Sequence, residues 1–206
     1  MRMVQTLAAT EDAVHPGPAQ AAGLTQWHED VRERTGAAVA GFVRDRCDEY
    51  VRGVPGADLI RELLGSYVAG GKYVRPTFAY LGWLCGADES DAALRAAAST
   101  ELVHAFALIQ DDVMDRSRLR RGRTTAHVRL ADWYGSRGLA GDERHFGESA
   151  AILLSDLLLV WAERMLRESG LGADALSRGW AVYDTLRGEL AVGQFADLCY
   201  LSLIHI

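Results

Sequence analysis

The sequence predicts an all-α fold, a bundle of long and mostly antiparallel helices. Apolar residues recur at the spacing of a buried helix face along several segments, and no stretch alternates apolar and polar residues as a half-buried strand does. Hydrophobic residues make up 49% of the 206 positions, which is enough for the core of one domain. Long amphipathic helices bury their apolar faces by packing against one another as a bundle.

The first part of the chain is expected to hold a leader and three helices. Residues 1–23 contain Ala, Pro and Gly without periodicity, so we expect a flexible leader. Apolar residues at helical spacing predict one helix over residues 24–52 and another over residues 58–68. Pro76 suits the first turn of a third helix, which is expected to end near Cys85.

The rest of the chain is expected to form three more long helices. Residues 86–88 read Gly-Ala-Asp and break the pattern, and a long helix is predicted from about Ser90 to Asp115. Residues 134–147 are rich in Gly and charge, which predicts a surface loop. Two further helical patterns cover residues 149–168 and residues 173–200.

A cluster of acidic residues lies just before a cluster of basic residues. Asp111 and Asp115 lie one turn apart on the predicted helix, so their carboxylates converge and repel each other unless a cation lies between them. Hard oxygen ligands suit Mg²⁺, which is usually held by one or two carboxylates together with substrate phosphates; Mn²⁺ is the alternative ion. Arg120 and Arg121 follow closely and would bind the same phosphates. The two clusters together predict a diphosphate site.

Lys72 is a second functional signal, because it is the only lysine in the chain. An ammonium group on a flexible stem can bind a phosphate oxygen as a point charge. Gly70 and Gly71 precede it and let the backbone approach a ligand closely. Taken alone, this segment is equally well explained as a turn between helices with an incidental lysine. Together with the acidic and basic clusters, it favours a phosphate-binding loop.

Five short motifs follow one another in the order 71–76 (GKYVRP), 111–115 (DDVMD), 120–122 (RRG), 151–156 (AILLSD) and 193–198 (GQFADL). In this order they resemble the polyprenyl synthetase family, the trans-isoprenyl diphosphate synthases. A DDxxD segment alone is usually a solvated helix face, so the signal comes from the whole series. Three positions depart from the family pattern, Tyr73, Thr124 and Ser155, but none removes a charged group that the chemistry needs. The resemblance implies the isoprenoid synthase type of all-α bundle.

The resemblance implies a metal site and an allylic diphosphate site. Asp111 and Asp115 would bind Mg²⁺ that bridges the diphosphate of an allylic substrate. Asp112 would support the metal ions or their waters, so it belongs to the implied metal set. Arg120 would hold the same allylic diphosphate.

The resemblance also implies a second site, for isopentenyl diphosphate. Four side chains would hold its diphosphate: Lys72, Arg75, His104 and Arg121. Gln194 and Asp197 would line the pocket near the reacting ends of the two substrates. The implied catalytic residues are Asp111, Asp115, Lys72, Arg120 and Gln194. For His104 the alternative is a buried core role, since a lone histidine on a helix face is often satisfied by its neighbours.

The residues just before the first aspartate are those that form the floor of the chain-elongation tunnel in this family. Phe106 lies five residues before Asp111, and the small Ala107 lies four before it. Bulk beneath the site stops chain growth by steric exclusion. One aromatic beside one alanine resembles the synthases that make geranylgeranyl diphosphate, with farnesyl diphosphate as the near alternative.

Three function classes are compatible with these motifs. The first is a prenyltransferase that condenses isopentenyl diphosphate with an allylic diphosphate to give a longer trans-prenyl diphosphate. The second is a class I terpene cyclase, which shares the acidic motif but binds one diphosphate and does not need the segment 71–76. The third is a non-catalytic subunit of a prenyl synthase. The presence of that segment favours the prenyltransferase.

Composition and charge limit the partners and the location. The net charge of −6 argues against a general affinity for nucleic acid or anionic membranes, although the arginines of residues 116–123 could form a solvated basic loop. Three widely spaced cysteines favour a reducing compartment. The N-terminus lacks a signal-peptide pattern, and the apolar stretch 150–162 is too short to span a membrane. A cytoplasmic protein without a transmembrane segment is expected.

The C-terminal end carries an expectation of its own. Relative to the family pattern, residues 24–200 would be the N-terminal part of a single domain, and a second aspartate-rich motif would follow. Residues 201–206 match the translation of a sequencing-adapter sequence and are expected to be a non-native tail. We therefore expect a bundle that is incomplete at its C-terminus, a 206-residue chain that is inactive alone, and a homodimer at full length.

Overall fold

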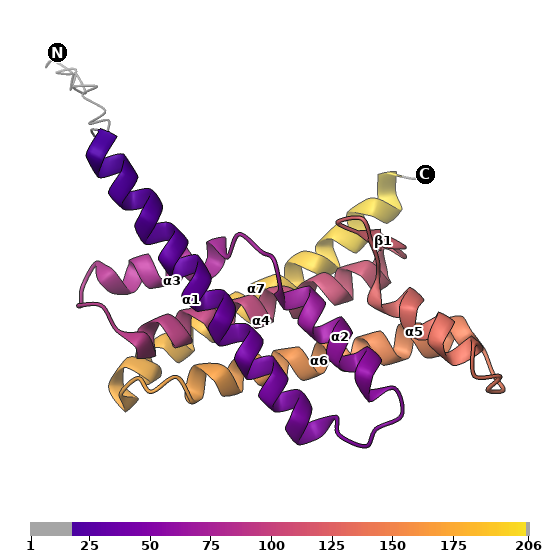
Figure 1. Cartoon of the computed structure of the whole chain (residues 1–206). Coiled ribbons are helices and arrows are strands. Elements are labelled where there is room, and N and C mark those ends of the chain that lie inside the picture. Colours follow the sequence, from indigo (N-terminus) through magenta and orange to yellow (C-terminus); the bar gives the residue numbers. More distant parts are fainter. Residues whose placement is uncertain (1–17, 205–206) are drawn as a thin grey trace, which may run out of the picture.

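The computed structural model describes residues 18–204, and the side chains of residues 22–200. Within this part the chain is almost entirely helical, which confirms the all-α prediction (Figure 1). The elements in order are α1 (Pro18–Tyr50), α2 (Ala57–Val68), α3 (Val74–Leu84), α4 (Asp91–Met114), β1 (Leu119–Arg120), β2 (Arg123–Thr124), α5 (Ala126–Gly135), α6 (Glu143–Arg167) and α7 (Ala173–Ile204).

Helix α4 lies at the centre of the bundle. Ser90 caps its first turn by accepting a hydrogen bond from the Ala93 amide, and twelve of its residues are buried. It packs against α6 over most of its length and also against α1, α2 and α3. In length and apolar composition α4 could cross a membrane, but 61% of its most apolar window is buried inside the protein, as expected for a core helix.

Two hydrophobic clusters hold the bundle together. The larger one joins α1, α2, α4 and α6 around fully buried side chains such as Leu64, Leu102 and Trp161. The smaller one joins α1, α3 and α4 around Val31 and Tyr80. Fully burying a side chain of this size stabilises the fold by roughly 1.5–3 kcal/mol, so these clusters fix the positions of α3 and α4, on which the site is built.

The predicted surface loop over residues 134–147 is wrong at both ends. Helix α5 extends to Gly135, and α6 begins at Glu143 after the side chain of Asp142 caps the His145 amide. Gly147, which suggested a loop, instead lies in α6 directly against α5. A β-carbon there would lie 2.2 Å from the carbonyl oxygen of His127. The glycine is needed for close helix packing, not for chain flexibility.

The N-terminal boundary also differs from the expectation. Helix α1 begins at Pro18, whereas the pattern predicted a helix from residue 24. Residues 1–17 of the predicted leader lie outside the described residues, as do the side chains of the predicted tail 201–206. The predicted division of the chain at these points remains a prediction.

A small β-hairpin follows α4 and was not predicted. Strands β1 and β2 pair antiparallel, with Leu119 opposite Thr124 and Arg120 opposite Arg123. The two turn residues, Arg121 and Gly122, have φ values of 51° and 76°. Positive φ at both central positions is what a two-residue type I′ hairpin turn requires. Strands of two residues give no alternation that a sequence pattern could reveal.

Helix α7 is packed much less closely than α4. Of its described side chains, Tyr183 alone is buried, and Trp180 and Leu190 pack partly against the larger cluster. Large apolar side chains remain exposed along it, including Val192 and Phe195, at 70% and 69%. Figure 1 shows α7 running lengthwise behind α4 towards the end of the described chain.

Candidate diphosphate-binding site

The acidic cluster at the end of α4 is held by one arginine of the hairpin. Arg120 donates from Nε to Oδ1 of Asp112 at 2.8 Å and from Nη2 to Oδ2 of Asp111 at 2.7 Å. Asp112 also accepts a hydrogen bond from the Tyr67 hydroxyl at 2.8 Å. The two aspartates differ in exposure, since the side chain of Asp112 is 1% exposed and that of Asp111 is 37% exposed. Asp111 therefore faces the solvent, whereas Asp112 faces the protein interior.

Asp115 has no fixed partner. It is exposed at the C-cap of α4, and its carboxylate forms no hydrogen bond or ion pair with another described side chain. Partial burial, followed by the negative charge of Asp111, raises the pKa of Asp115. A cation near Asp111 and Asp115 would relieve this repulsion, so these oxygen donors fit Mg²⁺.

The described side chains contain no ready-made cage of three or more metal-binding groups. Both oxygens of Asp112 are bonded to Tyr67 and Arg120. The predicted metal role of Asp112 remains a prediction, and the geometry favours Asp111 and Asp115 as the ligands.

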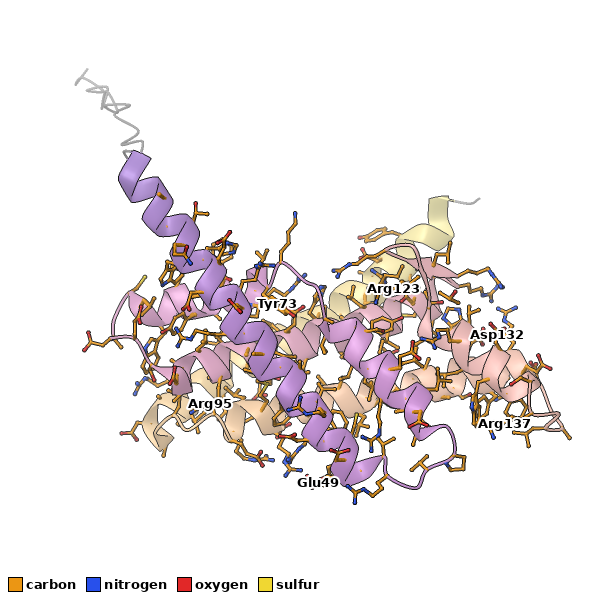
Figure 2. The ribbon with its side chains drawn as sticks, viewed as in Figure 1. Glu49, Tyr73, Arg95, Arg123, Asp132 and Arg137 are labelled. Carbon is orange, nitrogen blue, oxygen red and sulfur yellow. The ribbon has the colours of Figure 1, made fainter. Side chains whose placement is uncertain are left out.

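The predicted isopentenyl diphosphate residues converge on one hollow between the α2–α3 loop, the start of α3, α4 and the hairpin. Lys72, Arg75, His104 and Arg121 all line it, together with the backbone of residues 70–71; its volume is about 370 Å³. We call it the cation hollow. None of the three cationic side chains forms an ion pair or side-chain hydrogen bond with another described residue. Figure 2 labels Tyr73 on the α2–α3 side of this region and Arg123 on the hairpin side.

The electrostatics of the cation hollow favour an anion. Burial, followed by the charges of Arg75 and Arg121, lowers the pKa of His104 to about 4, so its imidazole is neutral at pH 7. One buried carboxyl group, that of Glu101, lines the same hollow; it is 5% exposed, and burial raises its pKa. Unpaired cations beside a neutral imidazole can hold a diphosphate through charge-assisted hydrogen bonds.

A larger apolar groove opens directly from the cation hollow. It is lined by α3, α4 and α7, its volume is about 1040 Å³, and it shares Val74, Arg75 and His104 with the hollow. Ala107 lines this groove, whereas Phe106 packs against the larger hydrophobic cluster. The chain-length roles of both residues remain predictions.

The two predicted residues of α7 are not brought into the site. Gln194 is half-buried and Asp197 is exposed, and neither lines the cation hollow or the groove. Sequence reasoning also missed Tyr67, which is bonded to Asp112, and Glu101, which lines the cation hollow. Both stand on helix faces among apolar residues, where pattern alone does not separate a functional side chain from a satisfied core residue.

The fold and the site define a class of protein: an all-α bundle in which an unpaired set of cations lies beside an apolar groove, with a carboxylate pair at the end of the central helix α4. Residues 57–203 match the family model described as Polyprenyl synthetase, and the chain belongs to this family.

Several relatives agree with this assignment. A geranylgeranyl diphosphate synthase of Saccharolobus solfataricus is 32% identical over 143 residues, covering 68% of this chain and 38% of the relative. A short chain isoprenyl diphosphate synthase of Methanothermobacter thermautotrophicus is 36% identical over 163 residues, covering 79% and 45%.

A solved structure is similar as well. The geranylgeranyl pyrophosphate synthase of Corynebacterium glutamicum, determined with isoprenyl diphosphate and magnesium, superimposes with a TM-score of 0.69 at 35% identity. The match covers 82% of this chain and 48% of that one. The chain therefore spans less than half the length of each of these three relatives.

Proposed function

We propose that this chain carries the diphosphate-binding part of a trans-prenyltransferase, which condenses isopentenyl diphosphate with an allylic diphosphate into a longer prenyl diphosphate. The observation that carries the proposal is the cation hollow: Lys72, Arg75 and Arg121 converge there, and none of them forms an ion pair with a described carboxylate. It lies beside the separate group of Asp111 and Arg120. Two neighbouring places for two diphosphates are what a condensation of two diphosphate substrates needs.

In this proposal each group has a defined task. Lys72, Arg75 and Arg121 hold the diphosphate of isopentenyl diphosphate, and neutral His104 donates a hydrogen bond to it. Arg120 binds the diphosphate of the allylic substrate. Asp111 and Asp115 would hold Mg²⁺, which supplies positive charge to the departing diphosphate; Mn²⁺ is the alternative ion. No protein nucleophile is required, because the double bond of isopentenyl diphosphate attacks the allylic carbon as its bond to the diphosphate breaks. The resulting cation then loses a proton to the departing diphosphate, which restores a double bond.

The apolar groove supports a prenyl product and bears on its length. It begins at His104 and continues past Ala107 between α4 and α7, so a growing chain can extend into it away from the charged groups. We propose geranylgeranyl diphosphate as the product, with farnesyl diphosphate next. A homodimer and a cytoplasmic location complete the proposal.

The separate cation hollow also argues against a class I terpene cyclase, which needs one diphosphate site. Calorimetric titration of this chain tests whether it has one diphosphate site or two. We expect isopentenyl diphosphate to bind without Mg²⁺, since the hollow holds it with side chains alone. Geranyl diphosphate is expected to bind only with Mg²⁺ and to lose that binding in Asp111→Asn.

Binding is the decisive readout because the chain spans less than half the length of its relatives. A chain that does not bind isopentenyl diphosphate would refute the prenyltransferase. Binding of geranyl diphosphate alone, with Mg²⁺, would instead support a cyclase. Labelled isopentenyl diphosphate with a series of allylic diphosphates, separated by chromatography, then reports any turnover and the product length.

A further inference from the structure

Tyr67 connects three elements through one hydroxyl group. It lies near the end of α2 and donates a hydrogen bond to Oδ2 of Asp112 in α4 at 2.8 Å. The hydroxyl oxygen of Tyr67 also accepts a hydrogen bond from the amide of Ala126, at the start of α5, at 3.1 Å. Burial raises the pKa of Tyr67, so the hydroxyl keeps its proton and remains a donor. A single side chain thus joins both ends of the segment that carries Arg120.

The segment between these ends is held by further bonds. Thr125 donates from its amide to the carbonyl of Arg118 at 3.1 Å and from its hydroxyl to the carbonyl of Ser117 at 2.7 Å. The amide of Ser117 in turn donates to the carbonyl of Asp112 at 2.9 Å. The hairpin therefore starts from a fixed base, and Asp112 is the acidic residue in that base.

The two bonds that Arg120 makes are unequal. Its Nε contacts Asp112, which is buried and also bonded to Tyr67, whereas its Nη2 contacts the much more exposed Asp111. Breaking a buried ion pair is costly, because the remaining charge stays buried without its partner. An ion pair near the surface contributes little to stability. The bond to Asp112 is therefore the permanent one, and the bond to Asp111 is the one that a ligand can replace.

We propose that Tyr67 is a positioning residue for the allylic diphosphate: it holds Asp112, and through Asp112 it fixes the Nε end of Arg120 while the Nη2 end can move from Asp111 to a diphosphate oxygen. This inference rests on the proposed function of Arg120. It assigns Asp112 to the support of Arg120, and leaves Asp111 and Asp115 to the metal.

Tyr67→Phe tests the proposal because it removes the hydroxyl and keeps the ring. The matched control is Tyr80→Phe, which likewise removes a hydroxyl that accepts a backbone hydrogen bond, here from the amide of Ser90, in the smaller hydrophobic cluster. Calorimetry with geranyl diphosphate and Mg²⁺ should show about a 10-fold loss of affinity in Tyr67→Phe, as expected when a supporting partner of a ligand-binding group is lost. Affinity for isopentenyl diphosphate should not change in either variant.

A ligand-free readout keeps this test separate from the proposed function. The Nε–H resonance of Arg120 in ¹⁵N-labelled protein reports its bond to Asp112, and Arg120→Lys, which lacks that group, identifies the signal. We expect the signal to shift or broaden in Tyr67→Phe and to stay in place in Tyr80→Phe. An unchanged signal in Tyr67→Phe would overturn the proposal, even if the wild-type chain binds no diphosphate and the proposed function fails.

A double substitution checks that Tyr67 acts through Arg120. If it does, adding Tyr67→Phe to Arg120→Lys causes no further loss of geranyl diphosphate affinity, because the two effects are not independent. Additive losses, or equal losses for isopentenyl diphosphate, would mean that Tyr67 only supports the fold, and the proposal would be wrong. If the double variant binds too weakly to measure, the Arg120 resonance of the single variant Tyr67→Phe decides between these outcomes.

Discussion

Helices α4 and α7 are both long and both carry residues predicted to serve the site, but the protein holds them in opposite ways. Twelve residues of α4 are buried, and five other helices pack against it. Among the described side chains of α7, Tyr183 alone is buried, and Val192 and Phe195 are largely exposed. The site groups on α4 are therefore fixed by packing, whereas Gln194 and Asp197 stand on a helix with few such constraints.

This difference shows that packing holds the α4 part of the predicted site much more firmly than the α7 part. The cation hollow and the aspartates are formed by helices that share a core, so their geometry exists before any ligand binds. The α7 residues depend on the position of one loosely packed helix. Substitutions that compare the packed core with α7 can break or sharpen this distinction.

The largest expected effect comes from matched leucines. Leu102→Ala, in the fully buried part of α4, should lower the free energy of unfolding by about 2–5 kcal/mol, since it leaves a cavity in the larger cluster. Leu186→Ala, at 42% exposure on α7, should cost less than about 1 kcal/mol. Denaturant unfolding measures both. Equal costs would show that α7 is as tightly packed as α4.

Matched glycines should give effects of opposite sign. Gly147→Ala should destabilise by about 1–3 kcal/mol, because its β-carbon would overlap the His127 carbonyl between α5 and α6. Gly188→Ala on α7 meets no atom within 4 Å, so it should stabilise by about 0.5–1 kcal/mol through helix propensity. Thermal unfolding of both variants provides the measurement. A destabilised Gly188→Ala would reveal packing on α7 that the structure does not have.

Ligand binding should follow the same division. Lys72→Ala removes a charge from the cation hollow and should weaken isopentenyl diphosphate about 10- to 100-fold, the scale of one charge-assisted hydrogen bond. Gln194→Ala on α7 should change that affinity by less than about 3-fold, because its side chain does not line the hollow. Arg44→Ala, an exposed arginine of α1, is the charge control. Calorimetric titration should show the largest loss of isopentenyl diphosphate affinity for Lys72→Ala, a smaller loss for Gln194→Ala and the smallest for Arg44→Ala.

The last expected effect is on the pH dependence of stability. The pKa of His104 is held near 4 in the folded chain, against 6.5 for an unperturbed histidine. Between pH 4 and pH 6.5 the unfolded chain binds this proton more readily than the folded chain does. The contribution of His104 to the free energy of unfolding is therefore fully present above about pH 6.5 and falls as the pH drops towards 4. His104→Gln should flatten this part of the profile. Identical pH profiles for the two proteins would contradict the low pKa of His104.

The sequence predicted the helices and the site unevenly, for physical reasons. Periodicity located α2, which has one apolar face that the core buries, and the long apolar run located α4, which the core buries on most sides. Pro76 located the start of α3. The motifs led to Lys72, Arg75 and Arg121, which the fold indeed brings together. Motif spacing did not reveal that Asp112 faces inward or that Tyr67 reaches it from α2, since those contacts depend on how separate helices are rotated against each other.

The weak packing of α7 was equally hidden. Its apolar character equals that of the buried helix α4, and composition does not reveal whether another element covers a helix. The hairpin after α4 was missed because two positive-φ residues, one of them Arg121, define it more than any alternation does.

The single lysine of the chain has a practical consequence. Lys72 is exposed at the cation hollow and forms no ion pair with another described residue. An amine-reactive acylating reagent therefore has one lysine to modify in the whole sequence, and that lysine lies where the diphosphate is proposed to bind. Protection of this amine, read as the mass of one peptide, would report occupancy of the hollow directly. Lys72 can therefore serve as a chemical probe of ligand binding.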